Sequence, residues 1–414
     1  MRATLNLLMR GLSLGCKFLL VFALAEFITP VEMGAYGLIA AIIGLGVYLL
    51  GLEFYTYSTR ELVHARPEQR RSLILTQFLL YTLLYMAALP ALQLVFAMYE
   101  LPKHYLWLVY GLLIAEHIAL ELNRVLIALD QALYAGYVLF VRMGAWVMVL
   151  IAFQYWVEQM RQLSTVLYFW GAGLLLACIL GLVRVWQVLD HSQPTRIRLA
   201  WLIRGLRVIG PLLVASIALR AFSTLDRFML ESVAGIEAVA PYVVYAGVCA
   251  AVISLIDAGV VDFLYPKLIR LAQQQNEFEL RQTLKSAALT MVLLASGMLL
   301  IANLVGGYLV SVFTKPIYYE NYWMLGWLSA GTLMYVLSLP AHLYLYATRK
   351  DHAIMYSQLL GLAVFLATFF ILKAPLHLKE QAVLAGLIAG WMVSALSKSY
   401  WAFLTTGQPP SRIN

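Results

Sequence analysis

Charged residues are scarce in this chain of 414 residues. They make up 12% of it, whereas Asp, Glu, Lys and Arg make up about 25% of a typical soluble domain. Hydrophobic residues make up 63%, and the mean hydropathy is +0.81. A soluble domain is excluded, because too few charged side chains are present to cover its surface. The composition predicts an all-α polytopic membrane protein built from long apolar helices.

Cysteine and the common catalytic motifs are also nearly absent. The three cysteines, Cys16, Cys178 and Cys249, lie inside apolar runs without the spacing of a metal site or a disulfide framework. No His-Glu-x-x-His, P-loop or nucleophile elbow occurs. The connections opposite the basic loops are short, whereas a membrane-embedded polymerase or ligase usually carries its catalytic residues on a sizeable external loop. We therefore expect no enzyme activity and no cofactor.

Apolar runs long enough to span a bilayer are, by contrast, abundant, since one span needs about 20 apolar residues. The first run contains Lys17, which argues against a cleaved signal peptide because the core of a signal peptide is uncharged. A polar, Pro-containing stretch after the sixth run separates two six-helix bundles, residues 1–200 and 201–414. Twelve spans are predicted, at 7–27, 34–52, 73–98, 105–127, 135–156, 164–188, 206–226, 239–262, 286–313, 323–346, 353–372 and 382–404.

The basic residues predict how these spans are oriented. With both termini in the cytoplasm, seventeen Lys and Arg residues fall on the cytoplasmic side and five on the opposite side. This asymmetry follows the positive-inside rule. It explains the formal net charge of +8 without a nucleic-acid partner, and we expect none.

Several basic residues lie inside the predicted spans, where an ionised group costs several kcal/mol unless it faces a cavity or a partner. Lys17 lies about 15 Å into the first span and Arg220 about 20 Å into the seventh, so these two are the strongest candidates for a cationic cavity. Salt-bridged packing between helices is the structural alternative. The full set of candidates for substrate binding is Lys17, Arg142, Arg220, Arg227 and Arg124.

Acidic residues inside spans suggest coupling of transport to H+ or Na+, because buried carboxylates commonly form proton relays. The candidates are Glu116, Asp226 and Asp257. Glu116 has no basic residue on the same face of its own helix. Glu121 and Arg124 are three residues apart and are expected to pair. Asp226 is expected near the membrane interface, at the end of the seventh span.

The two halves show a short internal similarity. Lys17 precedes Glu32 and Tyr36, and Arg220 precedes Glu237 and Tyr242. Because each half has an even number of spans, both halves enter the membrane from the same side, as in transporters built from parallel repeats. We therefore predict two bundles related by pseudo-two-fold symmetry. In the last span, the spacing of Gly386 and Gly390 allows close helix packing.

Three segments carry a resemblance to a known family: ITPVEMGAYGLIAAIIGLGVYLLGLEFYTYSTREL at 28–62, TLDRFMLESVAGIEAVAPYVVYAGV at 224–248 and, more weakly, NRVLIALDQALYAGYVLFVRMG at 123–144. The first contains the turn (T/S)-P-x-E-x-G-x-Y and the second an Asp-Arg pair followed by a Tyr. They resemble Wzx-type polysaccharide (O-antigen) flippases of the MOP exporter superfamily. Pro241 stands where that family more often has Gly.

The resemblance implies a V-shaped, alternating-access transporter in the bacterial inner membrane. It would move an undecaprenyl-diphosphate-linked oligosaccharide from the cytoplasmic to the outer leaflet for lipopolysaccharide or other surface polysaccharide assembly. The implied partners are this lipid-linked oligosaccharide, membrane lipids, and a polysaccharide polymerase or chain-length regulator. Arginine and lysine suit its diphosphate. Within the superfamily, the alternatives are a multidrug and toxin exporter and the lipid II flippase, which has fourteen helices.

Overall fold

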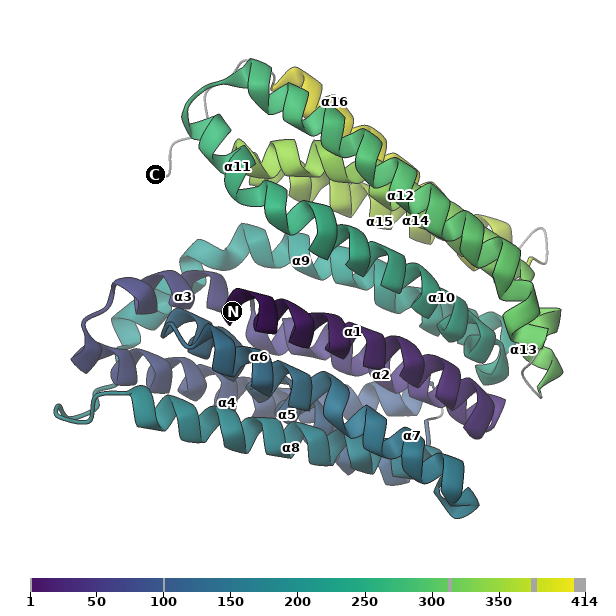
Figure 1. The fold of residues 1–414 in the computed structure, drawn as a ribbon, viewed down its shortest axis with the longest axis horizontal. Helices are drawn as coiled ribbons and strands as arrows, with labels where there is room; N and C mark the ends of the chain where they lie inside the picture. Colours follow the sequence, from purple (N-terminus) through teal and green to yellow (C-terminus); the bar gives the residue numbers. More distant parts are fainter. Residues whose placement is uncertain (1, 100, 312–314, 374–377, 406–414) are drawn as a thin grey trace. The chain divides into compact units, whose positions relative to one another are not determined.

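The computed structural model describes residues 2–99, 101–311, 315–373 and 378–405, in which every regular element is a helix (Figure 1). Among these described residues, eleven helical segments are long and apolar enough to cross a membrane. A twelfth is present if the two parts of α9, Leu199–Gly210 and Leu213–Ala234, count as one span. The predicted fold class, an all-α polytopic membrane protein with about twelve spans, is confirmed.

The chain divides into two compact units, Met1–Ile217 and Ala218–Asn414. The division falls inside α9 (Leu199–Ala234), which contributes to both. The boundary predicted at residues 200 and 201 lies near the start of the same helix and stays a prediction. The other helices of the first unit are α1 (Arg2–Phe27), α2 (Pro30–Gly51), α3 (Tyr55–His64), α4 (Pro67–Met98), η1 (Lys103–Tyr105), α5 (Leu106–Ala128), α6 (Ala132–Phe140), η2 (Val141–Ala145), α7 (Trp146–Trp156), η3 (Glu158–Met160) and α8 (Leu163–Val188).

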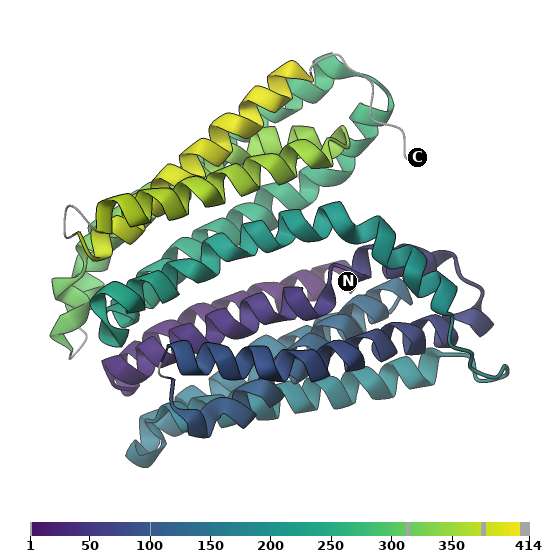
Figure 2. The ribbon, with the colours of Figure 1, turned by 180° about the vertical axis from the view of Figure 1, so that it is seen from behind.

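The second unit contains, besides its part of α9, a long interrupted helix and four further spanning helices. Its elements are α10 (Ile236–Ile256), η4 (Asp257–Val261), α11 (Asp262–Gln273), α12 (Glu277–Ser311), α13 (Pro316–Glu320), α14 (Trp323–Ala347), α15 (Asp351–Lys373) and α16 (Glu380–Leu404). Helix α16 packs along both α14 and α15, and Figure 2 shows α15 and α16 side by side.

Helices extend beyond several of the predicted spans. Helix α4 begins at Pro67, within the basic loop, because Pro at the first helical position and Glu68 in the first turn favour a helix start there. Helix α9 continues to Ala234, so Asp226 lies two turns inside it. The predicted position of Asp226 near the membrane interface stays a prediction, because a helix can extend beyond the bilayer. The eighth span is likewise extended, because α10 continues through η4 into α11 as far as Gln273.

The turn between α1 and α2 is fixed by a capping box. Thr29 precedes α2, its hydroxyl accepts a hydrogen bond from the Glu32 amide, and a Glu32 carboxylate oxygen accepts one from the Thr29 amide (3.0 Å). The other oxygen of Glu32 accepts a hydrogen bond from the amide of Leu163, the first residue of α8 (3.0 Å). Pro30 occupies the first helical position. The Thr-Pro-x-Glu motif thus joins three helices, which is a structural role.

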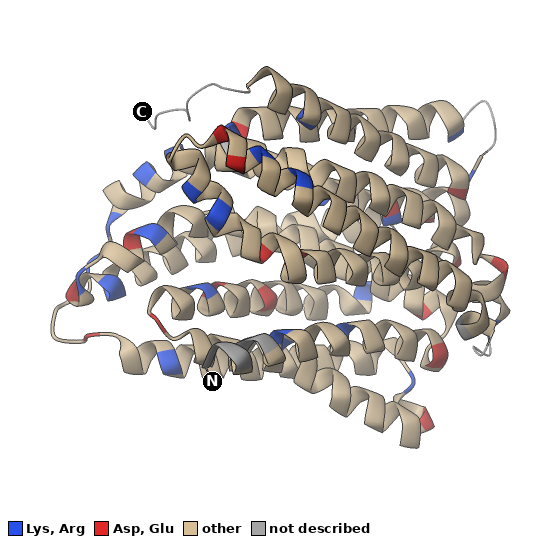
Figure 3. Cartoon of the chain, turned by 45° about the horizontal axis from the view of Figure 1, so that its top comes forward, with Lys and Arg blue, Asp and Glu red and all other residues tan. Residues whose placement is uncertain are grey.

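The surfaces of the helices are suited to lipid. Large apolar side chains are exposed along the spans, for example Trp156 (81%), Leu304 (72%) and Phe403 (78%). Most charged residues lie toward helix ends, as Figure 3 shows, and few lie in the central turns. A water-soluble protein would bury apolar side chains of this size. The chain is a multi-pass membrane protein, and the charges inside its spans therefore need a specific explanation.

Candidate functional site

The first buried charge pair joins α5 to the π-helical segment η2. The Arg142 guanidinium donates to Oε1 of Glu116 from both Nη2 (2.5 Å) and Nε (3.1 Å). Both residues are buried, with 8% and 9% of their surfaces exposed. Two hydrogen bonds to one carboxylate in a low-dielectric environment make this a strong contact. Glu116 therefore has a basic partner, which its own helix does not provide.

A π-helical turn places Arg142 where it meets Glu116. Residues Val141–Ala145 widen the helix between α6 and α7, and the Trp146 indole donates a hydrogen bond to the Arg142 carbonyl oxygen (2.9 Å). Such single π-turns inside α-helices interrupt the regular bonding pattern and occur often at functional sites. Segment η2 packs against α1 and α8. Arg142 is thereby directed into the first unit.

Lys17 on α1 completes a three-residue cluster, defined here as the unit 1 charge cluster: Lys17, Glu116 and Arg142. Its ammonium interacts electrostatically with both other members, although it forms no ion pair within 4 Å with any described residue. Unlike the other two, Lys17 is exposed. Oε2 of Glu116 is buried without a well-formed hydrogen bond to a described residue, and the Trp170 indole is its polar neighbour. Two cations thus share one carboxylate, with one cation accessible.

In a second network of the first unit, both oxygens of the carboxylate are bound by neighbouring side chains. Glu121 pairs with Arg124, as predicted, and its other oxygen accepts hydrogen bonds from Gln77 (2.8 Å) and the Tyr81 hydroxyl (2.9 Å). The Arg124 guanidinium lies 3.4 Å from the centre of the Tyr55 ring. These contacts engage Arg124 from both sides. They favour a structural role for Arg124, whose predicted contact with substrate stays a prediction.

His117, next to Glu116, is part of the packing of this unit. Its Nδ1 lies 2.8 Å from the Tyr85 hydroxyl, and its side chain is fully buried. Its Nε2 faces Gly51, where an added Cβ would lie 3.1 Å away. His117 is thus hydrogen-bonded within the first unit.

In the second unit, Asp226 links α9 to α10. The Tyr242 hydroxyl donates to Oδ2 of Asp226 (2.5 Å), and the Arg227 amide donates to Oδ1 (2.8 Å). The Arg227 guanidinium lies 3.7 Å from Oδ1 and also donates to the Ser223 carbonyl oxygen. Asp226 is 5% exposed. The Asp-Arg and Tyr positions of the second motif thus form one contact between neighbouring helices.

Arg220 and Asp257 both influence Tyr335. Both charges interact electrostatically with the Tyr335 side chain, which comes from α14. Asp257 opens the second π-helical segment, η4, and is half-buried. It makes no hydrogen bond or ion pair with any residue that the structure describes. Of the three acidic candidates, Asp257 is thus the one whose carboxylate is not already bound.

The structure therefore groups the predicted residues within each unit. Lys17, Arg142 and Glu116 form one cluster and Asp226 and Arg227 a second, while Arg220 and Asp257 each interact electrostatically with Tyr335. Lys17 and Arg220 belong to different units, and their meeting across a common cavity stays a prediction.

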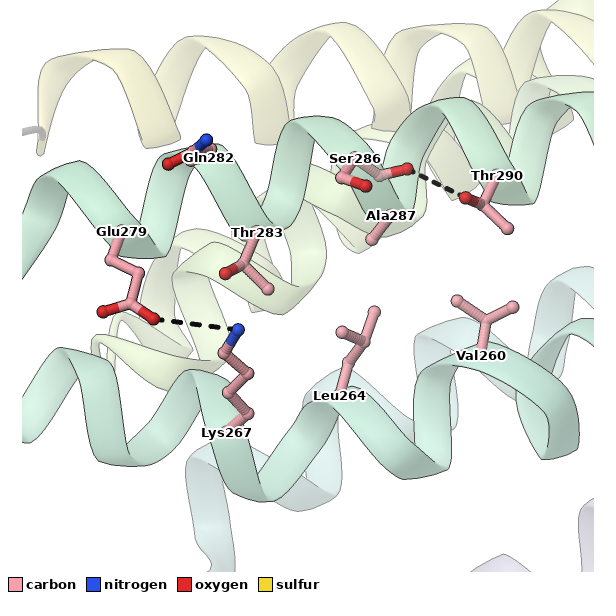
Figure 4. A pocket seen from close by; sticks show the side chains of 9 residues that line it. All are labelled: Val260, Leu264, Lys267, Glu279, Gln282, Thr283, Ser286, Ala287 and Thr290. Carbon is pink, nitrogen blue, oxygen red and sulfur yellow. Dashed lines mark hydrogen bonds and ion pairs between the residues drawn. The ribbon is translucent and has the colours of Figure 1, made fainter.

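A cavity of about 430 Å³ lies between η4 and α11 on one side and α12 on the other (Figure 4). Lys267 and Glu279 close one end with an ion pair of 3.8 Å. The hydroxyl groups of Thr283, Ser286 and Thr290 line the α12 side. No pattern in the sequence had indicated this cavity, because it depends on how the two helices pack.

Known proteins resemble this chain in structure but not in sequence. No protein-family model matches it, and no curated protein sequence matches it. An inward-facing multidrug resistance MATE family transporter of the MOP superfamily has a TM-score of 0.76 and 14% identity, over 94% of each chain. An outward-facing MATE family transporter of the same superfamily has a TM-score of 0.59 and 15% identity, over 98% of this chain and 95% of that chain.

A third solved structure is a MOP superfamily transporter from Pyrococcus furiosus, with a TM-score of 0.57 and 16% identity, over 99% of this chain and 95% of that chain. It is described as having a binding pocket of reverse polarity that suggests a different function. At identities of 14–16%, these similarities concern the fold. They agree with the helical architecture described above, and the chain has the fold of MOP-superfamily transporters.

Proposed function

We propose that this protein is a flippase that moves a polyprenyl-diphosphate-linked oligosaccharide across the bacterial inner membrane, from the cytoplasmic to the outer leaflet. The observation that carries the proposal is the unit 1 charge cluster, in which Lys17 is exposed while Arg142 neutralises Glu116. A positive group held in the middle of a span suits an anionic head group. The two phosphates of the lipid supply such a head group.

Charge distinguishes this proposal from its main alternative, export of amphiphilic cations. A cation carrier needs an accessible carboxylate, but Glu116 and Glu121 are both buried and paired with arginines. The reverse-polarity pocket of the Pyrococcus furiosus transporter supports the idea that the MOP fold accommodates cargo of different charge. A MATE-type exporter stays the alternative, with Asp257 as the acid it would use.

Transport would follow the alternating-access scheme of proteins built from two repeats. The diphosphate would bind when the site is open to the cytoplasm, with Lys17 of the first unit as a ligand. The lipid chain would remain in the bilayer. Both chain termini would lie in the cytoplasm, as the basic loops predict.

Replacing Lys17 tests the site directly. The measurement uses liposomes with the full-length protein and a flipping probe, undecaprenyl diphosphate carrying a fluorescent oligosaccharide, whose outward movement is followed with a membrane-impermeant quencher. We expect Lys17→Ala to slow flipping about tenfold, the effect of one lost charge-assisted hydrogen bond. Lys17→Arg should keep most of the rate. The control is Lys103→Ala, which removes an exposed lysine at the very end of a span. Wild-type flipping by Lys17→Ala would exclude the site.

Replacing Asp257 tests ion coupling. Because its carboxylate has no described partner, we expect Asp257→Asn to lose the acceleration of flipping by an imposed sodium or proton gradient. Each gradient is applied separately, which identifies the ion. Asp262→Asn, five residues further along and exposed, is the matched control. An Asp257→Asn protein that responds to both gradients like wild type would remove Asp257 from this role.

A further inference from the structure

The cavity between α11 and α12 runs from the charged into the apolar part of the second unit (Figure 4). Lys267 and Glu279 lie at its charged end, and α12 carries no further charge between Lys285 and Ser311. At 1.5 Å per residue, Thr290 at the other end lies roughly 16 Å further along α12 than Glu279. The head-group layer of a bilayer is about 5–8 Å thick. A cavity of this length therefore suits a head group together with the first carbons of its acyl chains.

The charged end of the cavity offers one cation and one anion that can both take a ligand. Nζ of Lys267 lies 3.8 Å from Oε1 of Glu279, which is too far for a hydrogen bond. Lys267 forms no hydrogen bond with a residue that the structure describes, so its three N–H donors are available. The two side chains are 52% and 47% exposed, and an exposed ion pair is weak. A ligand that binds both charges can therefore separate them at little cost.

Helix α12 adds hydroxyl groups beside this ion pair. Thr283 points across the cavity toward α11, and Lys267 points toward α12 from the opposite side (Figure 4). The hydroxyl groups of Thr283 and Ser286 form no hydrogen bond with any residue in the described part of the chain. The Thr290 hydroxyl donates to the Ser286 carbonyl oxygen (3.0 Å) and can still accept a hydrogen bond. The cavity thus presents a cation and two hydroxyl donors on one side of a single carboxylate.

We propose that this cavity binds the head group of phosphatidylethanolamine, a zwitterionic phospholipid, at the edge of the bilayer. The lipid phosphate accepts hydrogen bonds from the Lys267 ammonium and from the hydroxyl groups of Thr283 and Ser286. The ethanolamine ammonium donates to Oε1 of Glu279, which replaces Lys267 as its partner. The cavity volume of about 430 Å³ falls within the range of about 300–1,000 Å³ that is usual for ligand sites. This lipid site is separate from the proposed cargo and does not depend on it.

The arrangement of charges distinguishes this lipid from others. An anionic lipid such as phosphatidylglycerol would satisfy Lys267 but bring its negative charge beside Glu279 without a cation to offset it. The choline group of phosphatidylcholine has no N–H and cannot donate a hydrogen bond to the carboxylate. The glycerol and the first acyl carbons lie against apolar side chains, which soluble phosphoethanolamine could not use. These apolar lining residues are Val260, Leu264 and Ala287.

Native mass spectrometry of the full-length protein in detergent measures the dissociation constant of the first bound lipid. Phosphatidylethanolamine, phosphatidylcholine and phosphatidylglycerol with the same acyl chains are titrated separately. We expect phosphatidylethanolamine to bind about tenfold more tightly than either of the others, the effect of one charge-assisted hydrogen bond. Soluble phosphoethanolamine should bind more weakly than all three. Any other lipid in first place, equal binding of the three, or equally tight binding of phosphoethanolamine would overturn the proposal.

Two substitutions test the phosphate and the ammonium contacts one at a time. Lys267→Ala should weaken binding of phosphatidylethanolamine and of phosphatidylcholine about tenfold each, because both lipids carry the phosphate. Glu279→Gln should leave phosphatidylcholine binding unchanged and remove the preference for phosphatidylethanolamine. The control is Arg270→Ala, which removes an exposed cation of α11 that does not line the cavity and should bind both lipids like wild type. A retained preference in Glu279→Gln, or equal losses in Arg270→Ala and Lys267→Ala, would overturn the proposal in favour of general attraction to a basic surface.

Discussion

Arg142→Met is expected to destabilise the first unit by about 3 kcal/mol, the lower end of the range for removing one partner of a buried ion pair. The substitution leaves the Glu116 carboxylate buried without its two guanidinium hydrogen bonds. Lys17 remains nearby and offsets part of this loss. The measurement is the temperature at which half of the detergent-solubilised protein stays monodisperse in size-exclusion chromatography.

A double variant distinguishes the cost of leaving one charge buried and unpaired from the loss of the ion pair itself. The double variant Glu116→Gln, Arg142→Met removes both buried charges and leaves only the exposed Lys17, so most of the lost stability should return. Arg184→Met is the control, because Arg184 contacts Gln131 (2.7 Å) and forms no ion pair with a described residue. If Arg142→Met alone melts like wild type, the pair does not hold η2 against α5.

Gly390→Val should separate α16 from its neighbours and cost about 3 kcal/mol, the upper end of the range for overpacking. A Cβ at Gly390 would lie 2.8 Å from the Gly361 carbonyl oxygen of α15 and 2.7 Å from the Phe222 ring. The oxygen belongs to the backbone, so relief requires a helix to move. The Phe222 ring itself stacks with the rings of Phe365 (centroids 5.9 Å apart) and Trp391 (4.4 Å).

The matched control places the same side chain where nothing opposes it. Gly297 on α12 is exposed, and a Cβ there meets no atom within 4 Å. Gly297→Val should change stability by less than about 0.5 kcal/mol. Equal losses from the two substitutions would mean that valine in a span is costly in itself and that the α15–α16 contact is not responsible.

The helical architecture could be predicted from the sequence, because each long apolar run corresponds to one helix that crosses the bilayer. Helix ends were less predictable, because the bilayer limits apolar length and not helix length. Asp226 shows this: the apolar run ends beside it, but the helix continues to Ala234. The glycines at 386 and 390 were correctly expected to allow close packing, since a Cβ at either would lie within 3 Å of a neighbouring backbone oxygen.

Ion pairs could be predicted from the sequence only where both residues lie on the same helix. Glu121 and Arg124 are three residues apart, so helical geometry alone brings them together. Glu116 and Arg142 are 26 residues apart, and their contact depends on a π-turn and on how α5 packs. The burial of Lys398 on α16 could not be predicted, because a single lysine near the end of a span usually reaches toward water. Its burial follows from α14 and α15, which no local pattern describes.

The joint formed by Thr29, Pro30 and Glu32 has a consequence for how relatives of this protein are found. These three residues link α2 to the end of α1 and to the start of α8, and none of them belongs to a charged cluster. Selection for a sound architecture would preserve this turn even while the cargo changes. A sequence profile built on this turn would therefore match proteins that share the fold but carry different molecules. Distinguishing them by cargo would require comparing the residues at the positions of Lys17, Glu116 and Arg142.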